Sequence, residues 1–467
     1  MTLKPKRKIL TISSNKLSAE DGNVITTMGV YDCQLPCRNY TIQYKASVLG
    51  AVTLSSEFVL RLLKSVKRID EDDAASFFGF DYRELSFILQ ELESFGYIKR
   101  KQGQVSLSTD GEALFSEKSQ IPMIFEVDER TAKVGIDSVS LGLEKSSRLS
   151  TVQLRFPELP ILDPKSASDG IENAKSLFRK NFFELSGSKD TRPQDRPALY
   201  SIDSVLATYR FPSSVRVSIG SKRKSPSVVE TTLSDWDVVE DMEERVEVLR
   251  SAKEFADQLI TQRRDTDADS YDVLINTATE FLSEWTRQDG LSKQRYYHEC
   301  LSRTGEVRSD RETVPVVGSL FVKENLRRLL DQIRYTDIDD NFPDKIVWLA
   351  PDVPYWGATT SLSDIVNQLQ KEFSPSDDEI EAIGIVPEGL EWHLMPAFNR
   401  TLRRHVKVPS SLEILLIPNQ LCSVIVHAPF LPRGLPVPLG FISRNTDVVD
   451  RTKKILAEYC PSGMFKV

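Results

Sequence analysis

One short segment constrains the fold of this chain more than any other. In LQELESFGYIKRKQGQVSLSTDG, residues 89–111, a helical pattern ends at Gly96, and an alternating pattern then turns back on itself at Gly103. A glycine just after the last helical residue is a common helix stop, and a glycine between two alternating segments is typical of a hairpin turn. The segment therefore predicts a helix followed directly by a β-hairpin.

The preceding residues predict two more helices. A first helix is indicated by apolar residues at helical spacing, namely Phe58, Leu62, Leu63 and Val66. The segment DEDDAASFF, residues 70–78, predicts a short second helix whose acidic start suits the helix dipole. Asp81 is a suitable N-cap for the third helix, whose buried stripe is Leu85, Ile88, Leu89 and Leu92.

This arrangement, and above all LQELESFGYIKRKQGQVSLSTDGEALF, resembles the winged-helix superfamily over about residues 55–118. The resemblance implies that the third helix enters the major groove of DNA and that the hairpin, the wing, contacts phosphates. The residues expected at such an interface are Tyr82, Arg83, Ser86 and Gln90 on the helix and Lys99, Arg100 and Lys101 on the wing. A second basic loop, SKRKSPS at residues 221–227, adds Lys222, Arg223 and Lys224.

The charges of the same region oppose DNA binding. The third helix carries Asp81, Glu84, Glu91 and Glu93 against the single cation Arg83, so a phosphate backbone meets repulsion unless these carboxylates point aside. Phe87, on the outward face of that helix, is typical of a protein contact. Winged helices also serve as protein adaptors and dimerisation modules, so the residues leave open a DNA reader, a protein adaptor and a structural module.

The rest of the chain predicts a multidomain α+β protein with five consecutive parts. Residues 1–50 are expected to form a small β element, 51–118 the winged helix, 119–232 a β-rich domain, 233–305 a pair of helices, and 306–467 an α/β domain. Within the helical pair, apolar periodicity predicts one helix over 237–263 and another over 271–288, packed together.

The C-terminal part resembles the phospholipase D-like fold through VVGSLFVKENLRRLL, KIVWLAPDVPYW and LGFISRN. That family cleaves phosphodiesters with paired histidine, lysine and aspartate motifs. His405 and Lys407 match the first two positions of one motif, but Leu412 stands where the aspartate belongs, beside Glu413, and no second such pair of histidine and lysine exists. A non-catalytic descendant is therefore expected.

Metal and cofactor motifs are weak or missing. Cys33 and Cys37, with His298 and Cys300, are a candidate zinc set only if the two segments meet in space. Two buried thiols are the favoured alternative. The chain lacks the phosphate-binding, dinucleotide-binding, zinc-protease and serine-hydrolase motifs, so no cofactor is expected.

The overall charge restricts any nucleic-acid surface to a local patch. The chain has 60 lysines and arginines against 68 aspartates and glutamates, a formal charge of -8. No apolar run is long enough to span a membrane, and the basic segment MTLKPKRKILTISSNK lacks the apolar core of a secretion signal, so a cytoplasmic location is expected.

The favoured hypothesis is a non-enzymatic, DNA-associated protein, a regulator or accessory subunit of a bacterial DNA-handling or phage-defence (antiviral defence) assembly. The alternatives are a scaffold subunit that uses the winged helix as a protein adaptor, and a phosphodiesterase or nuclease with a degenerate phospholipase D-like site. The expected partners are DNA and protein subunits, including a second copy of the chain, and no membrane.

Overall fold

The protein has a mixed α+β fold. The computed structural model describes residues 25–49, 52–115, 121–122, 125–146, 149–186, 197–223, 225–236, 245–302, 309–336, 342–374, 380–389, 394–461 and 464. The chain divides into two compact units, each built from separated segments. Unit 1 contains residues 1–37, 137–167 and 211–467, and unit 2 contains residues 38–136 and 168–210. The units therefore regroup the parts that were predicted as consecutive domains.

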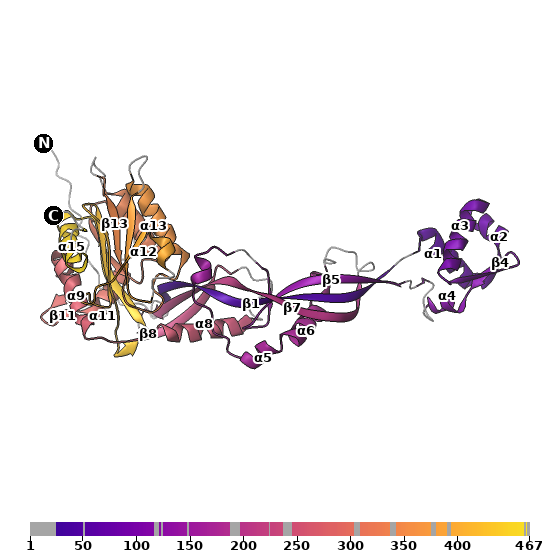
Figure 1. Cartoon of the computed structure of the whole chain (residues 1–467), viewed down its shortest axis with the longest axis horizontal. Helices are drawn as coiled ribbons and strands as arrows, with labels where there is room; N and C mark the ends of the chain where they lie inside the picture. Colours follow the sequence, from indigo (N-terminus) through magenta and orange to yellow (C-terminus); the bar gives the residue numbers. More distant parts are fainter. Residues whose placement is uncertain are drawn as a thin grey trace, which may run out of the picture. The chain divides into compact units, whose positions relative to one another are not determined.

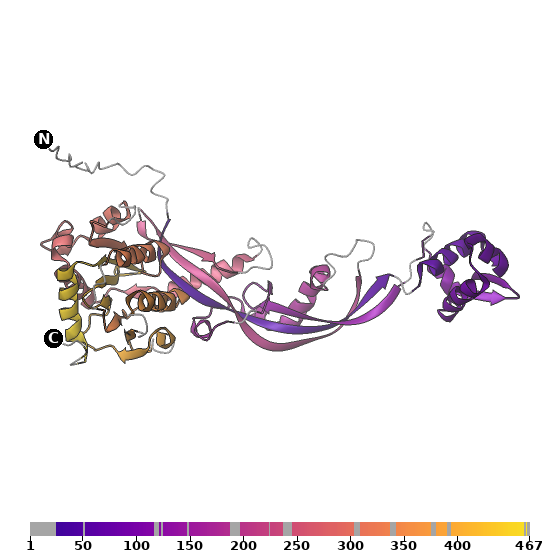
Figure 2. The same cartoon turned by 90° about the horizontal axis from the view of Figure 1, so that it is seen from above.

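Residues 54–113 of unit 2 form a bundle of helices with a small sheet, here called the α1–α4 segment (Figures 1 and 2). Its helices and strands follow in the order α1 (Leu54–Val66), β2 (Arg68–Asp70), α2 (Glu71–Phe78), α3 (Tyr82–Ser94), β3 (Ile98–Lys101), β4 (Gln104–Leu107) and α4 (Thr109–Ala113). The strands form an antiparallel sheet in the order β2-β4-β3. The predicted three helices and hairpin are confirmed.

Local sequence signals account for the ends of these elements. The Asp81 side chain accepts a hydrogen bond from the backbone N–H of Glu84, and the Glu84 side chain accepts one from the backbone N–H of Asp81. These two bonds form a capping box at the start of α3. Gly96 and Gly103 have φ angles of 74° and 77°, the left-handed region that glycine adopts without strain. The helix stop and the hairpin turn therefore lie at the predicted residues.

Three long strands, β5, β1 and β7, form the centre of a five-stranded sheet. The sheet has the order β6-β5-β1-β7-β8, built from β1 (Ile25–Leu49), β5 (Phe125–Asp137), β6 (Leu143–Glu144), β7 (Ala198–Lys222) and β8 (Ser225–Ser234). The small β element predicted for residues 1–50 is instead, in its described part, one long strand. The region predicted as β-rich also contains α5 (Pro164–Ser168), α6 (Gly170–Lys180) and α7 (Phe182–Leu185).

Unit 1 is centred on a mixed seven-stranded sheet with the order β12-β19-β17-β16-β13-β14-β15. The strands are β12 (Thr313–Val317), β13 (Lys345–Leu349), β14 (Glu381–Val386), β15 (Arg400–Arg403), β16 (Leu412–Ile417), β17 (Leu421–Pro429) and β19 (Pro436–Ser443). The pairs β13–β14 and β14–β15 are parallel, and the other pairs are antiparallel. The prediction of a mixed α/β arrangement is confirmed at this coarse level.

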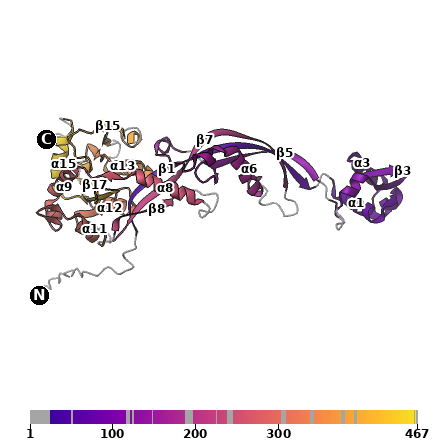
Figure 3. The ribbon, with the colours of Figure 1, turned by 90° about the horizontal axis from the view of Figure 1, so that it is seen from below.

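Helices cover both faces of this sheet (Figures 1 and 3). One face packs against α9 (Thr266–Thr277), α10 (Thr279–Leu282), α11 (Lys293–Ser302) and α15 (Thr446–Tyr459). The other packs against α12 (Lys323–Arg334) and α13 (Thr360–Phe373). Neighbouring residues of β13 alternate between the two cores, with Val347 in the first and Trp348 in the second. Strands covered on both sides are near-continuously apolar, which explains KIVWL and LEILLI.

The predicted pair of helices is wrong in its packing. Residues 237–244 lie outside the described residues, α8 covers Val246–Gln258, and the second helix is divided into α9 and α10. Phe255 of α8 packs in a core with β1 and β7, whereas Leu274 of α9 and Leu282 of α10 pack on the seven-stranded sheet. The two amphipathic stripes therefore face different cores, a choice that periodicity alone does not determine.

A buried arginine joins α8 to the β5–β6 turn. The Arg245 guanidinium donates to Asp137 at 2.8 Å, to Glu144 at 2.6 Å and to Ser140 at 3.0 Å, and it lies 4.2 Å from the centre of the Trp236 ring. Arg245, Asp137 and Glu144 have at most 2% of their side-chain surface exposed. Two buried carboxylates therefore depend on one cation.

Replacing Arg245 with methionine is expected to destabilise the fold by about 3–5 kcal/mol, because both carboxylates lose their charge partner while remaining buried. The free energy of unfolding in urea measures the effect. The control is Arg250→Met on the same helix, where the side chain is 67% exposed, and a change within about 0.5 kcal/mol is expected. Equal effects of the two substitutions would contradict the role of the buried network.

Candidate functional site

The outward face of α3 consists of the residues predicted for it. Tyr82 and Phe87 are each 71% exposed, Arg83 and Gln90 are also exposed, and Ser86 is half-buried. The opposite stripe, Leu85, Ile88, Leu89 and Leu92, is buried in the core of the α1–α4 segment. Because 3.6 residues make one turn, burial of this stripe leaves these five side chains facing outward, together with Glu84, Glu93 and Ser94, which are also exposed.

The acidic residues of α3 are engaged with their own segment. The carboxylate of Glu84 caps the N-terminus of its helix through the Asp81 N–H, at 3.0 Å. The carboxylate of Glu91 accepts hydrogen bonds from the Ser56 and Thr53 hydroxyls at the start of α1. Glu93 lies 3.9 Å from Arg100. These contacts turn Glu91 toward α1 and partly neutralise Glu93.

The hairpin cations differ in their availability. The Arg100 guanidinium donates to both carboxylate oxygens of Glu71, at 2.9 and 2.7 Å, and these hydrogen bonds raise the pKa of Arg100. Lys99 and Lys101 are exposed and form no ion pair with any residue that the structure describes. Two of the three predicted wing cations are therefore available to a partner, and Arg100 holds β3 to α2.

Exposed aromatic residues and a negative charge also mark the α1–α4 segment. Phe77 on α2 is 68% exposed, in addition to Tyr82 and Phe87 on α3. Residues 54–113 contain eight lysines and arginines against eleven aspartates and glutamates. This composition is compatible with a protein partner and limits the strength of phosphate binding.

The second basic loop, predicted to be exposed, belongs to the β7–β8 hairpin of unit 1. Lys222 is half-buried and lies 3.5 Å from Glu230 across the hairpin, and Arg223 is also half-buried. Lys224 lies outside the described residues. The prediction of an exposed loop is wrong for Lys222 and Arg223. Strand pairing extends to Lys222, which pairs with Ser225, and Arg223 lies half-buried in the tight turn that follows.

His405 and Lys407 lie exposed on the loop after β15. The Nδ1 atom of His405 accepts the backbone N–H of Lys407 at 3.2 Å, an arrangement local to the loop. Leu412 is buried in the sheet, and the neighbouring Glu413 pairs with His427 instead. The structure therefore does not bring Glu413 to the pair His405 and Lys407.

The cysteines of the candidate zinc set are packed as apolar residues. Cys33 and Cys37 lie on one face of β1 with Leu35 between them, and the Cys37 thiol donates to the Leu35 carbonyl at 3.2 Å. Four residues along a strand separate two side chains by about 13 Å. Cys300 belongs to the core beneath the seven-stranded sheet, and burial lowers the pKa of the half-buried His298. Among the described residues, no group of three or more potential ligands is placed to hold a metal ion.

A buried pair in unit 1, Glu413 on β16 and His427 on β17, was not predicted as a site. Glu413 accepts hydrogen bonds from the indole N–H groups of Trp348 at 3.0 Å and Trp356 at 3.2 Å, and it contacts Nε2 of His427. Glu413 pairs with Ile425 in the β16–β17 ladder, so His427, two residues farther along, lies on the same face. The available signal was one glutamate and one histidine in the mostly apolar strands LEILLI and LCSVIVHAP.

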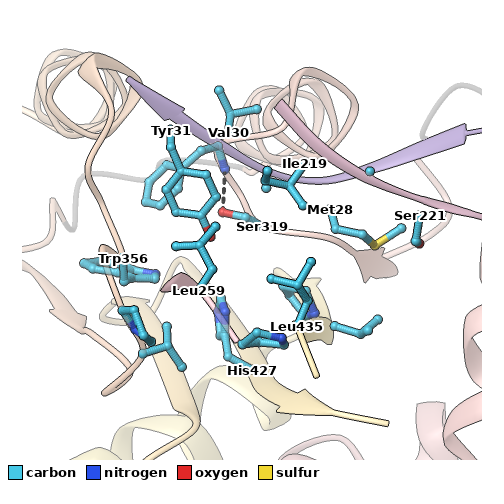
Figure 4. Close-up of a pocket in the computed structure, with 18 of the residues that line it drawn as sticks. Met28, Val30, Tyr31, Ile219, Ser221, Leu259, Ser319, Trp356, His427 and Leu435 are labelled. Carbon is cyan, nitrogen blue, oxygen red and sulfur yellow. Dashed lines mark hydrogen bonds between the residues drawn. The ribbon is translucent and has the colours of Figure 1, made fainter. Parts of the chain in front are cut away.

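His427 lines a small pocket with a volume of about 40 Å³ that is partly open to solvent. The pocket is bounded by β1, β7, the loop before α13 and the start of β19. Figure 4 shows His427 across the pocket from Met28 and Val30 of β1, with Leu259 between them and Trp356 at one side. It is an apolar pocket with one buried imidazole.

Comparisons with protein families, curated proteins and solved structures found no match. In the part of the chain that the structure describes, no helix has the length and apolar character needed to cross a membrane.

Thiol reactivity is expected to be low in the native protein. Burial raises the pKa of Cys422 and Cys460 to about 12, from an ordinary value of 9.0, and raises the pKa of Cys33 and Cys37 as well. Because the thiolate is the reactive form, a rise of about three pKa units reduces the reactive fraction at pH 8 about 1,000-fold. The measurement is the rate of reaction with Ellman's reagent at pH 8 before and after unfolding in guanidinium. Rapid reaction of Cys33 or Cys37 in the native protein would contradict this packing.

Proposed function

We propose that the α1–α4 segment is a winged helix that docks on duplex DNA, and that the chain acts as a regulator or accessory subunit of a DNA-handling assembly. One observation carries the proposal: Glu84 and Glu91 are hydrogen-bonded within the segment, which leaves Arg83, Ser86 and Gln90 on the outward face of α3. These three side chains can hydrogen-bond base edges or phosphates in the major groove.

The cations available for phosphates are few. Arg83 on α3 and Lys99 and Lys101 on the hairpin are exposed, whereas Arg100 is held by Glu71. Each phosphate contact contributes about 0.9 to the slope of log K against log salt for duplex DNA. Three contacts therefore support salt-sensitive binding of modest strength, with a slope of about 3.

Replacing Arg83, Lys99 and Lys101 together with alanine in the full chain is expected to weaken duplex binding at least tenfold. The salt dependence is expected to flatten by about 3 in log K per log salt, because three phosphate contacts are lost. Fluorescence anisotropy of a labelled duplex over a range of salt concentrations measures both quantities.

The matched control removes three cations of unit 1, through Arg250→Ala, Lys253→Ala and Arg334→Ala, all at exposed positions. This variant is expected to bind the duplex like the wild type. Equal losses in both variants would indicate a general charge effect, and an unchanged titration of the first variant would remove the α1–α4 segment from DNA binding.

A protein partner is the second candidate, favoured by a different observation. Phe77, Tyr82 and Phe87 are each about 70% exposed on α2 and α3, and the segment carries a net negative charge. Aromatic side chains are enriched at the centres of protein interfaces. An adaptor that docks through α3 would bury these rings.

Replacing Tyr82 and Phe87 with alanine is expected to remove any partner that the wild-type chain retains from a nuclease-treated extract of its native cells, because the central aromatic contacts are lost. Duplex binding by the same variant decides between the candidates. If the chain binds a protein through its aromatic face alone, the variant with Tyr82→Ala and Phe87→Ala loses the protein partner. The variant that lacks Arg83, Lys99 and Lys101 then keeps that partner. The control is Leu154→Ala together with Met395→Ala, two exposed apolar residues of unit 1.

A further inference from the structure

We propose that the His427 pocket of unit 1 binds a small, mainly apolar molecule with one acidic hydroxyl, of the phenol or enol class. In this complex, Nδ1 of His427 accepts the hydrogen bond of the hydroxyl. The inference is independent of DNA or protein docking by the α1–α4 segment, because it uses residues of unit 1 alone.

The walls of the pocket select an apolar ligand. No lysine, arginine, aspartate or glutamate is among its described lining residues. Small-molecule sites are typically apolar pockets with a few polar groups. Tyr31, Phe321 and Trp356 provide aromatic surface for a flat ring, and the remaining apolar lining is Met28, Val30, Ile219, Val229, Leu259, Val353, Pro354, Leu435, Pro436, Val437 and Pro438.

The hydrogen bonds around Glu413 determine what His427 offers to a ligand. The carboxylate of Glu413 accepts from two tryptophan N–H groups and contacts Nε2 of His427, so the arrangement is satisfied when Nε2 carries a proton and donates it. The neutral imidazole then has its lone pair on Nδ1. The backbone also holds the residue, since the His427 N–H donates to the Ser411 carbonyl at 2.7 Å.

The lone pair on Nδ1 of His427 is available to accept a hydrogen bond. The His427 side chain is 5% exposed, and among the described residues none hydrogen-bonds to Nδ1. A hydrogen-bond donor on a ligand in the pocket can therefore use this acceptor. A hydroxyl more acidic than an alcohol is the stronger donor. If its proton moves to Nδ1, the O–H bond breaks, the oxygen keeps the electron pair, and the carboxylate of Glu413 stabilises the imidazolium.

The experiment compares two probes on the full chain. 4-Nitrophenol carries the hydroxyl, and 4-nitroanisole has the same ring with a methyl ether that cannot donate. We expect 4-nitrophenol to bind at least tenfold more tightly in isothermal titration calorimetry, and to quench tryptophan fluorescence because Trp356 lines the pocket. Equal affinities for the two probes, or no binding of 4-nitrophenol, would overturn the proposal.

Three variants locate the binding. His427→Leu is expected to abolish the preference for 4-nitrophenol while weak binding of both probes remains, because the apolar walls are intact. Leu435→Trp fills the pocket while Glu413 and His427 are retained, and it is expected to abolish binding of both probes. His405→Leu, at an exposed histidine, is the matched control and is expected to behave like the wild type.

Thermal unfolding of each variant, followed by circular dichroism, shows whether it is folded. His427→Leu could fail to fold because Glu413 loses a hydrogen-bond partner. In that case Leu435→Trp and the comparison of the two probes on the wild type still test the proposal. Binding of 4-nitrophenol that survives Leu435→Trp would place the ligand elsewhere and refute the site.

Discussion

Glu413 places a carboxylate in a strand whose six residues are all buried, and a buried charge is tolerated only where hydrogen bonds replace the water it has lost. Here the donors come from three other segments, through Trp348 on β13, Trp356 on the loop before α13 and His427 on β17. The need to satisfy this one group links the centre of the sheet to its covering loop. It also orients His427 at the edge of the pocket.

The same requirement holds the other parts of unit 1 together. Arg245 lies between Asp137 and Glu144. Asp32 of β1 accepts the backbone N–H of Thr360 at the start of α13, at 2.7 Å, and Arg216 of β7 donates to Asp32 at 2.7 Å. A carboxylate at a helix N-terminus also interacts favourably with the helix dipole. Buried or half-buried charges therefore join segments that are up to 328 residues apart in the chain, as expected for a unit assembled from separated pieces.

The α1–α4 segment presents a mixed surface, in which two physical effects favour different partners. Engagement of Glu84 and Glu91 leaves a polar stripe on α3, and two lysines of the hairpin are exposed, which supports the proposed DNA docking. Phe87 and Tyr82 on the same helix add exposed apolar area, which gains no favourable contact with a phosphate backbone. Both sets of residues were predictable, because the position of a side chain on a helix follows from its spacing to the buried stripe. The direction of Glu91 was not, since it depends on hydroxyl groups 35 and 38 residues earlier in the chain.

By itself, the sequence determined the features that depend on near neighbours: the capping box at Asp81, the buried stripe of α3, the helix stop at Gly96 and the turn at Gly103. Only the tertiary structure decided that Arg100 is held by Glu71, that α8 and α9 pack on different cores, and that Glu413 meets His427 rather than His405. The physical reason is the range of the interactions. Caps, turns and helical stripes are set within a few residues, whereas pairs across strands and layers depend on register and topology, which no local pattern specifies.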